Sequence, residues 1–470
     1  MRFDRSGMYI HNPHGNQIIP VRARTHRYPL VGRHAMLWIW MREEFPPMLV
    51  ALLLTVIVMA MYGVPALREA DKTRIDAPYL ANPEAFAFEL IGNDASKPVD
   101  VWVDDWFFRA KPPANARLLA KLPIYATYRA ARSWGVAPLA AFFDSYRCWT
   151  AVFLFAFLLL GARCCATAAR HVAPTAVTAT GALEIVAMCA LAALPPVLFA
   201  CKFPIHGSPN DLLGYALIAA AMNALFSGNL VRYVMFALSG IACRETNLIT
   251  LLPLLILGPG SVRARAITAF AIVALSAVFH TVVGGTYDPL AGARHNWEFP
   301  WESAGFVYLT FGPLWLTAAF YGLRAAQRPE NSGARRFLLC AALSLPLVLA
   351  VVVGLARVRE IRILFVLYIY VVPLGLLGIH HFLATMTCAR RALLIGAFLL
   401  GVAVTFRLYV TLLPVDATDF ARKADALSSL YGGFGGGWQA EFLAYFLLAV
   451  PALAIGLSMG WVGATVRRRS

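Results

Sequence analysis

Long apolar runs separated by short basic loops dominate the chain. A helix needs about 20 apolar residues to cross the hydrocarbon core of a bilayer. The runs lie at roughly 47–64, 148–163, 176–200, 212–227, 230–243, 247–258, 266–283, 304–322, 337–355, 363–379, 392–409 and 442–463. This pattern predicts an all-α polytopic membrane protein with about twelve transmembrane helices.

The arginine-rich loops predict the orientation. Arg263, Arg265, Arg390 and Arg391 fall on the same side as the basic N-terminal arm. Lys and Arg concentrate on the cytoplasmic side, so both termini are expected there, as in a multi-pass protein of the bacterial inner (cytoplasmic) membrane. A single helix over residues 230–258 would move these arginines outside. The positive-inside rule therefore favours two short helices separated at Arg244 and Glu245.

The same pattern predicts the domain organisation. Residues 1–44 form a cytoplasmic basic arm that ends in an interfacial segment, and residues 45–470 form one transmembrane helical domain. A long first external loop, residues 66–147, is inserted into this domain. Residues 116–123 and 128–132 of the loop have the mixed pattern of amphipathic helices that lie on a membrane surface, where membrane lipids are their partners.

The charged residues are unevenly distributed between the two predicted sides of the membrane. The 41 Lys and Arg exceed the 25 Asp and Glu, which gives a net charge of +16. Cytoplasmic arginines explain much of this excess, so no nucleic-acid partner is predicted. The cytoplasmic segments contain only the acids Asp4, Glu43, Glu44 and Glu330. Acids contribute little to topology, so the acid-rich external face indicates a functional site there.

The external loop contains two adjacent carboxylates, Asp104 and Asp105, flanked by Trp102 and Trp106. We interpret the aromatic rings as surfaces on which a sugar stacks. A positioned carboxylate can take a proton from an attacking hydroxyl, so these two acids are catalytic candidates. A solvated loop held at the interface by its aromatic residues explains the same pattern.

Two charged motifs lie at the ends of apolar runs, at residues 244–247 and 357–362. Charges at membrane depth are costly and usually functional, and arginine forks bind phosphate oxygens in pairs. An internal ion pair that closes the helix ends is the alternative for the first motif. The predicted phosphate-binding residues are Arg244, Arg357, Arg359 and Arg362, with Glu245 and Glu360 orienting them.

Three further residues are candidate substrate or orienting groups. Asp211 precedes the fourth apolar run, where capping of a helix N-terminus explains it as well as a place in the site does. His295 and Trp297 belong to an external loop that mixes titratable and aromatic side chains. The external histidines lack the spacing of metal ligands, so neither a metal nor a cofactor is predicted.

With these motifs, the layout resembles the GT-C class of integral-membrane glycosyltransferases. The resemblance covers the first ten spans in arrangement, and the Arg244-Glu245-Thr246 and Arg359-Glu360-Ile361-Arg362 segments resemble motifs of bacterial relatives. It implies a polyprenyl-phosphate sugar donor and an acidic catalytic residue soon after the first span. That position favours Glu69, Asp71 or Asp76, whereas Asp104 and Asp105 lie farther along the loop.

These features predict a transferase that moves a sugar from a lipid-phosphate donor to a glycan, lipid or protein acceptor on the external face. Two alternatives remain open. A polysaccharide polymerase or ligase acting on lipid-pyrophosphate glycans would use the same arginines without a loop carboxylate. A twelve-span transporter or flippase would place polar groups near mid-membrane, where Glu184 is the clearest candidate.

Overall fold

The computed structural model describes residues 9–10, 19–20, 45–62, 98–108, 117–174, 180–201, 208–283, 307, 310–327, 329–355, 361–385 and 387. Contacts divide the chain into two compact units, Met1–Pro46 and Pro47–Ser470. In the first unit, β1 (Tyr9–Ile10) pairs antiparallel with β2 (Ile19–Pro20). Apart from this short ladder the regular elements of the described residues are helices, which confirms the helical class.

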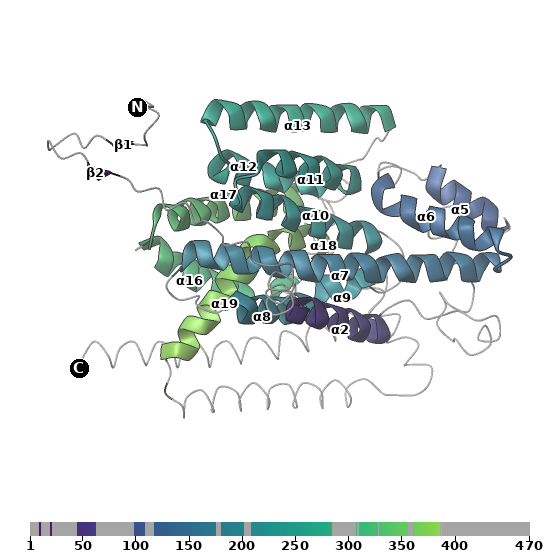
Figure 1. The fold of residues 1–470 in the computed structure, drawn as a ribbon, viewed down its shortest axis with the longest axis horizontal. Coiled ribbons are helices and arrows are strands. Elements are labelled where there is room, and N and C mark those ends of the chain that lie inside the picture. Colours follow the sequence, from purple (N-terminus) through teal and green to yellow (C-terminus); the bar gives the residue numbers. More distant parts are fainter. Residues whose placement is uncertain are drawn as a thin grey trace. The chain divides into compact units, whose positions relative to one another are not determined.

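The second unit is built from the helices drawn in Figure 1, with α2 starting just before its boundary. The first group is α2 (Phe45–Tyr62), α5 (Val99–Phe108), α6 (Leu118–Ser133), α7 (Pro138–Val172), α8 (Thr180–Ala193), α9 (Pro195–Cys201), α10 (Ser208–Phe226) and α11 (Leu230–Cys243). The second is η3 (Glu245–Thr250), α12 (Leu251–Leu257), α13 (Val262–Val283), α16 (Leu314–Gln327), α17 (Ser332–Leu355), α18 (Ile361–Leu364), η4 (Phe365–Leu367) and α19 (Tyr368–Thr385).

Four helical segments of the described chain are long and apolar enough to cross a membrane, which indicates a membrane protein. They are Pro138–Val172, Val262–Phe279, Ser332–Gly354 and Arg362–Thr385. Several shorter apolar helices coincide with other predicted spans, among them Asn210–Phe226 and Leu230–Cys243. The predicted spans at 392–409 and 442–463 lie outside the described residues.

Helix α7 is much longer than the predicted span at 148–163. Its 35 residues extend about 52 Å at 1.5 Å per residue, well beyond the roughly 30 Å of a hydrocarbon core. It begins at Pro138, whose fixed backbone angle suits a first helical position. The first turns carry Phe142, Phe143 and Tyr146 into contact with α5 and α6, so this helix joins the external loop to the bundle.

Other predicted spans are interrupted. The run at 176–200 is broken at Leu194, immediately before Pro195, into α8 and α9. Proline lacks a backbone N–H and clashes with the preceding turn, which explains the break. The run predicted at 304–322 is interrupted at Gly312: Thr310 and Phe311 are helical, Gly312 adopts a φ of +53°, and α16 begins at Leu314.

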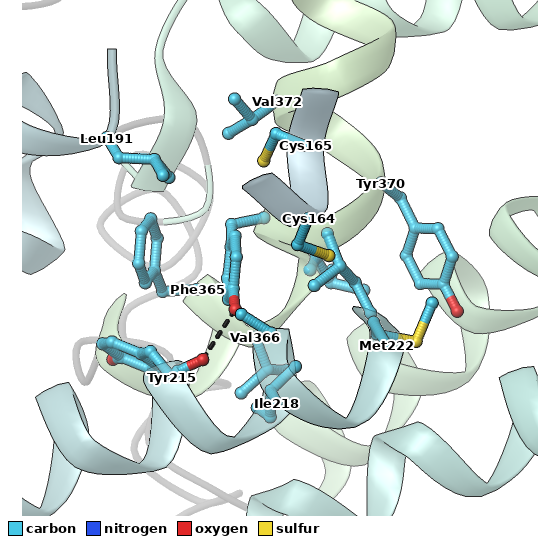
Figure 2. Packing of buried hydrophobic residues seen from close by; sticks show 14 of the residues in the cluster. Cys164, Cys165, Leu191, Tyr215, Ile218, Met222, Phe365, Val366, Tyr370 and Val372 are labelled. Carbon is cyan, nitrogen blue, oxygen red and sulfur yellow. Dashed lines mark hydrogen bonds between the residues drawn. The ribbon is translucent and has the colours of Figure 1, made fainter. Parts of the chain in front are cut away.

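The core of the bundle lies among α7, α10 and α19, which pack against one another. Figure 2 shows part of it, with Tyr215 of α10 next to Phe365 of η4. Helix α16 also lies close against α19. A Cβ added at Gly375 would come within 2.9 Å of Leu314, so the small residue allows this approach.

The described part of the predicted loop at 66–147 forms a small core of its own. Val103 and Trp106 of α5, Ile124 and Tyr128 of α6, and the start of α7 bury their side chains together. The two amphipathic segments predicted at 116–123 and 128–132 belong to the single helix α6. One face of α6 therefore packs on α5 and α7, while Leu122, on another face, is more than half exposed.

Candidate functional site

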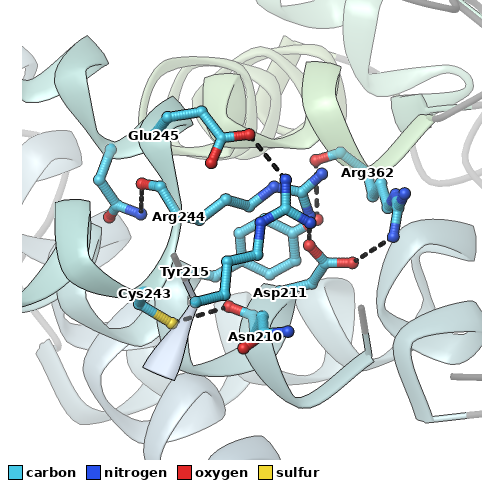
Figure 3. A network of polar contacts seen from close by, with 9 residues as sticks. Asn210, Asp211, Tyr215, Cys243, Arg244, Glu245 and Arg362 are labelled. Atoms are coloured by element: carbon cyan, nitrogen blue, oxygen red, sulfur yellow. Dashed lines mark hydrogen bonds and ion pairs between the residues drawn. The ribbon is translucent and has the colours of Figure 1, made fainter. Parts of the chain in front are cut away.

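The second unit contains a buried ionic cluster at Asp211. Asp211 has no exposed surface, and it forms ion pairs with Arg244 and with Arg362. The Nη1 atom of Arg362 lies 3.5 Å from Oδ2 of Asp211. Figure 3 shows Asp211 between the two arginines, with Glu245 beside them. Both predicted charged motifs therefore contribute an arginine to the same carboxylate.

Helix α10 positions Asp211. The helix starts at Ser208, so Asp211 lies inside its first turn and is not the N-cap. The capping interpretation is therefore wrong, because the helix begins before the predicted fourth span. A carboxylate in the first turn is still favoured by the partial positive charge at a helix N-terminus. Its side chain faces the arginines of two other segments.

A chain reversal positions Arg244. Helix α11 ends at Cys243, and Arg244 adopts extended backbone angles before η3 begins at Glu245. This break agrees with the prediction of two short segments. The Asn247 side-chain amide donates to the Arg244 carbonyl at 3.0 Å. Further along, the Tyr233 hydroxyl donates to the Thr250 carbonyl at 3.0 Å, so η3 returns alongside α11.

Arg117 links the α5–α6 segment to this cluster. It immediately precedes α6, and its Nη2 atom donates to Oε1 of Glu245 at 2.7 Å. The Arg117 residue is 8% exposed, whereas the Glu245 side chain is 40% exposed. Glu245 is the residue next to Arg244 in the chain. The loop and the bundle therefore meet through an ion pair directly beside the Asp211 cluster.

The side chains of the cluster indicate what it can bind. In the described part of the chain, three guanidinium groups, from Arg117, Arg244 and Arg362, form ion pairs with two carboxylates, from Asp211 and Glu245. Burying an ion away from water is costly unless it is paired. Phosphate oxygens match the fork of a guanidinium, so these arginines have the chemistry to bind an anionic group.

The loop carboxylates of α5 are divided between two surroundings. Asp100 accepts hydrogen bonds from Nε and Nη2 of Arg132 at 2.9 and 2.8 Å, and one from the hydroxyl of Tyr128. The Arg132 hydrogen bonds lower the pKa of Asp100. Asp104 accepts from the Tyr125 hydroxyl at 2.7 Å. Asp105 is buried, with 5% of the residue exposed.

Trp106 does not have the predicted sugar-stacking surface. Its ring makes an edge contact with Phe142, at 5.5 Å between centroids, and the Lys121 ammonium lies 5.1 Å from its centroid. Only 6% of Trp106 is exposed. We correct the prediction accordingly, because the small loop core takes up this side chain.

Seven predicted site residues lie outside the described residues: Asp71, Asp76, His295, Trp297, Arg357, Arg359 and Glu360. In the part of the chain that the structure describes, no three His, Cys, Asp or Glu side chains form a group suited to a metal ion.

Sequence reasoning missed two residues at the cluster. Arg117 resembled the other basic positions of an amphipathic surface helix, and no local signal distinguished it. Tyr215 fell inside an apolar run, whereas Asn247 belonged to the predicted motif at 244–247 without a role of its own. For Tyr215 the signal was available, since it lies four residues after Asp211 and so on the same helix face.

Comparisons with known proteins add little to this picture. No family model matches the chain, and no solved structure matches it. A segment of 40 residues is 42% identical to part of the oxygenase component of dicamba O-demethylase from Stenotrophomonas maltophilia. This match covers 8% of the chain and 12% of that protein. A similarity of this extent does not show a family.

Proposed function

We propose that this protein is a membrane glycosyltransferase. It moves a sugar from a lipid-phosphate donor to an acceptor on the external or periplasmic face of a bacterial inner membrane. The proposal includes about twelve spans, as the apolar runs predict, with both termini in the cytoplasm. The donor enters sideways from the bilayer, and the acceptor is a glycan, a lipid or a protein.

The observation that carries the proposal is the cluster of Arg117, Arg244, Arg362, Asp211 and the partly exposed Glu245, in which Asp211 and the arginines are buried. Buried charges are costly in a membrane protein and are usually functional. The guanidinium groups match the phosphate oxygens of a lipid donor. Arg244 and Arg362 bind the phosphate oxygens, and Arg117 supports them from the loop through Glu245.

The reaction breaks the bond between the anomeric carbon and the phosphate oxygen. The acceptor hydroxyl oxygen forms the new bond to that carbon, and its proton passes to a carboxylate acting as general base. The electron pair of the broken bond leaves with the lipid phosphate. Arginines positioned in advance stabilise the charge that develops there.

Asp105 is the preferred base among the described loop acids. It is the residue before Trp106, whose carbonyl accepts a hydrogen bond from Lys121 at 3.1 Å. Lys121 lies one turn of α6 after Arg117, the residue that pairs with Glu245 of the cluster. This chain of contacts connects Asp105 to the cluster. Asp71 and Asp76 remain candidates from the resemblance alone.

A polymerase or ligase acting on lipid-pyrophosphate glycans is the second candidate. The engagement of Asp100 and Asp104 within the α5–α6 core favours it, because that chemistry needs no loop base. The same arginines bind the pyrophosphate.

Replacing single acids distinguishes the two candidates. Asp105→Asn keeps the size of the side chain but removes the base, and should lower the rate of sugar transfer from a lipid-phosphate donor about 100-fold. Donor binding should persist, while Arg359→Ala should weaken it. Asp104→Asn is the matched control. Full activity of the Asn variants at positions 71, 76, 104 and 105 would exclude a loop base and favour the second candidate.

A further inference from the structure

Arg362 is held at two points by one face of α10. Asp211 contacts its guanidinium, and the hydroxyl of Tyr215, one turn later, donates to its backbone carbonyl at 2.8 Å. Tyr215 is 1% exposed. Because residues four apart share a helix face, a single surface of α10 sets both the backbone and the side chain of this arginine.

The segment that carries Arg362 is not held by regular helix alone. Helix α18 has four residues and is followed by the 3-10 turn η4. Helix α18, the turn η4 and α19 follow one another without a gap, and 3-10 geometry is poorer than that of an α-helix, so the helical stretch is weakest one turn after Arg362. A hydrogen bond from another helix therefore has a large influence on the orientation of α18.

Tyr215 is itself fixed in place. The hydroxyl of Tyr368, on α19, donates to the Tyr215 carbonyl at 2.7 Å. The Tyr215 ring packs edge-on against Phe365, with centroids 4.8 Å apart, and also contacts Phe157. These contacts leave the Tyr215 hydroxyl little freedom to move away from Arg362. Helix α19 thus donates a hydrogen bond to α10, and α10 donates one to α18, the segment that presents the arginine.

We infer that Tyr215, supported by Tyr368, is the positioning residue that orients Arg362 for an incoming lipid phosphate. This inference rests on the proposed function for the role of the phosphate, but the positioning itself does not. Tyr215 does not touch the reacting atoms. Its hydroxyl ties the Arg362 carbonyl to α10, and removing it would loosen the hold of α10 on the segment that presents the guanidinium to Asp211.

Tyr215→Phe tests the inference in the full-length protein in lipid nanodiscs. Tyr370→Phe is the matched control, since its buried hydroxyl contacts Cys340 at 3.3 Å and Ser344 at 3.1 Å. The first measurement is the rate at which phenylglyoxal modifies Arg362, followed by peptide mass spectrometry. The second is the dissociation constant for dodecyl phosphate.

Tyr215→Phe should speed modification of Arg362 and weaken dodecyl phosphate binding about 10-fold, or about 1.4 kcal/mol. Tyr370→Phe should change neither. Unchanged Arg362 reactivity in Tyr215→Phe would overturn the inference whatever the protein binds. Faster modification of Arg362 with unchanged dodecyl phosphate binding would overturn the role of Tyr215 in phosphate binding. If the wild type does not bind dodecyl phosphate, the proposed function fails. The rate of Arg362 modification alone then tests whether Tyr215 positions Arg362.

Tyr368→Phe covers the case in which Tyr215→Phe does not fold. It removes the donor to the Tyr215 carbonyl and should produce the same two changes to a smaller extent. Equal Arg362 reactivity in Tyr368→Phe and the wild type would then count against the inference.

Discussion

Asp211 balances the charge of two buried guanidinium groups. It has no exposed surface, and Arg244 and Arg362 are 2% and 7% exposed. Removing one partner of a buried ion pair leaves an uncompensated charge, which costs much more than the intact pair contributes. The stability of the cluster therefore depends on the carboxylate more than on either arginine.

Asp211→Asn should lower the free energy of unfolding by about 3–5 kcal/mol, because both arginines would lose their counter-charge. Asp144→Asn is the control, since the Asp144 side chain is 65% exposed and its contact to Arg147 is 3.8 Å. An exposed pair contributes about 0–1 kcal/mol. Thermal unfolding in detergent measures both, and equal losses for the two variants would contradict the buried role of Asp211.

Residue type alone identified several members of the cluster. Arg244, Glu245 and Arg362 stood out because charges are rare among apolar runs. Arg117 did not, because a basic side chain on an amphipathic helix is ordinary. Asp211 was ambiguous, since capping explains an Asp ahead of an apolar run equally well.

At the scale of elements, the reversal after α11 depends on close packing at Gly240. A Cβ there would lie 2.7 Å from Oδ1 of Asn247, the residue whose amide holds the Arg244 carbonyl. The lack of space beside Asn247 is therefore enough to restrict position 240 to glycine. The break at Arg244 was predicted from charge, but this contact was not.

Gly240→Ala should destabilise the protein by about 1–3 kcal/mol, because the added methyl group displaces Asn247. Gly354→Ala is the control, since a Cβ at that position of α17 meets nothing within 4 Å. Alanine is a better helix former than glycine, so the control should be neutral or stabilising. Denaturant titrations compare the two, and a neutral Gly240→Ala would refute the packing argument.

The α5–α6 core contains a buried ammonium group. Lys121 is 3% exposed, lies over the Trp106 ring and donates to the Trp106 carbonyl. Burial, with a smaller effect of the Arg117 charge, lowers the pKa of Lys121 to about 7 from its ordinary 10.5. The folded protein therefore releases this proton at a lower pH than the unfolded chain does.

Stability of this core should rise between pH 7 and about pH 10.5, since the unfolded state binds more protons there. Lys121→Met removes the charge and should abolish the rise while stabilising the protein at pH 7. Arg129→Met changes an exposed cation of the same helix and should keep the rise. Hydrogen exchange of α5 against pH measures this effect, and an identical pH dependence in Lys121→Met would disprove it.

At the scale of the whole molecule, the orientation in the membrane is a prediction from charge alone. Single cysteines at Ser261 and Ser429, in a background without native cysteines, test it. A membrane-impermeant thiol reagent should label the Ser429→Cys variant in intact cells and not the Ser261→Cys variant, because arginine-rich loops stay cytoplasmic. The reverse pattern would overturn the orientation and, with it, the external location of the site.

The sequence by itself determined the helical class, the apolar helices and the break between α11 and η3, because these depend on local hydropathy and local charge. It did not determine that α7 would continue into the external loop, since Phe142 and Tyr146 are buried only by α5 and α6. Only the tertiary structure joined Arg117 to Glu245 and Tyr215 to Arg362, which are 128 and 147 positions apart. Such contacts depend on how distant helices pack, and no local pattern encodes that packing.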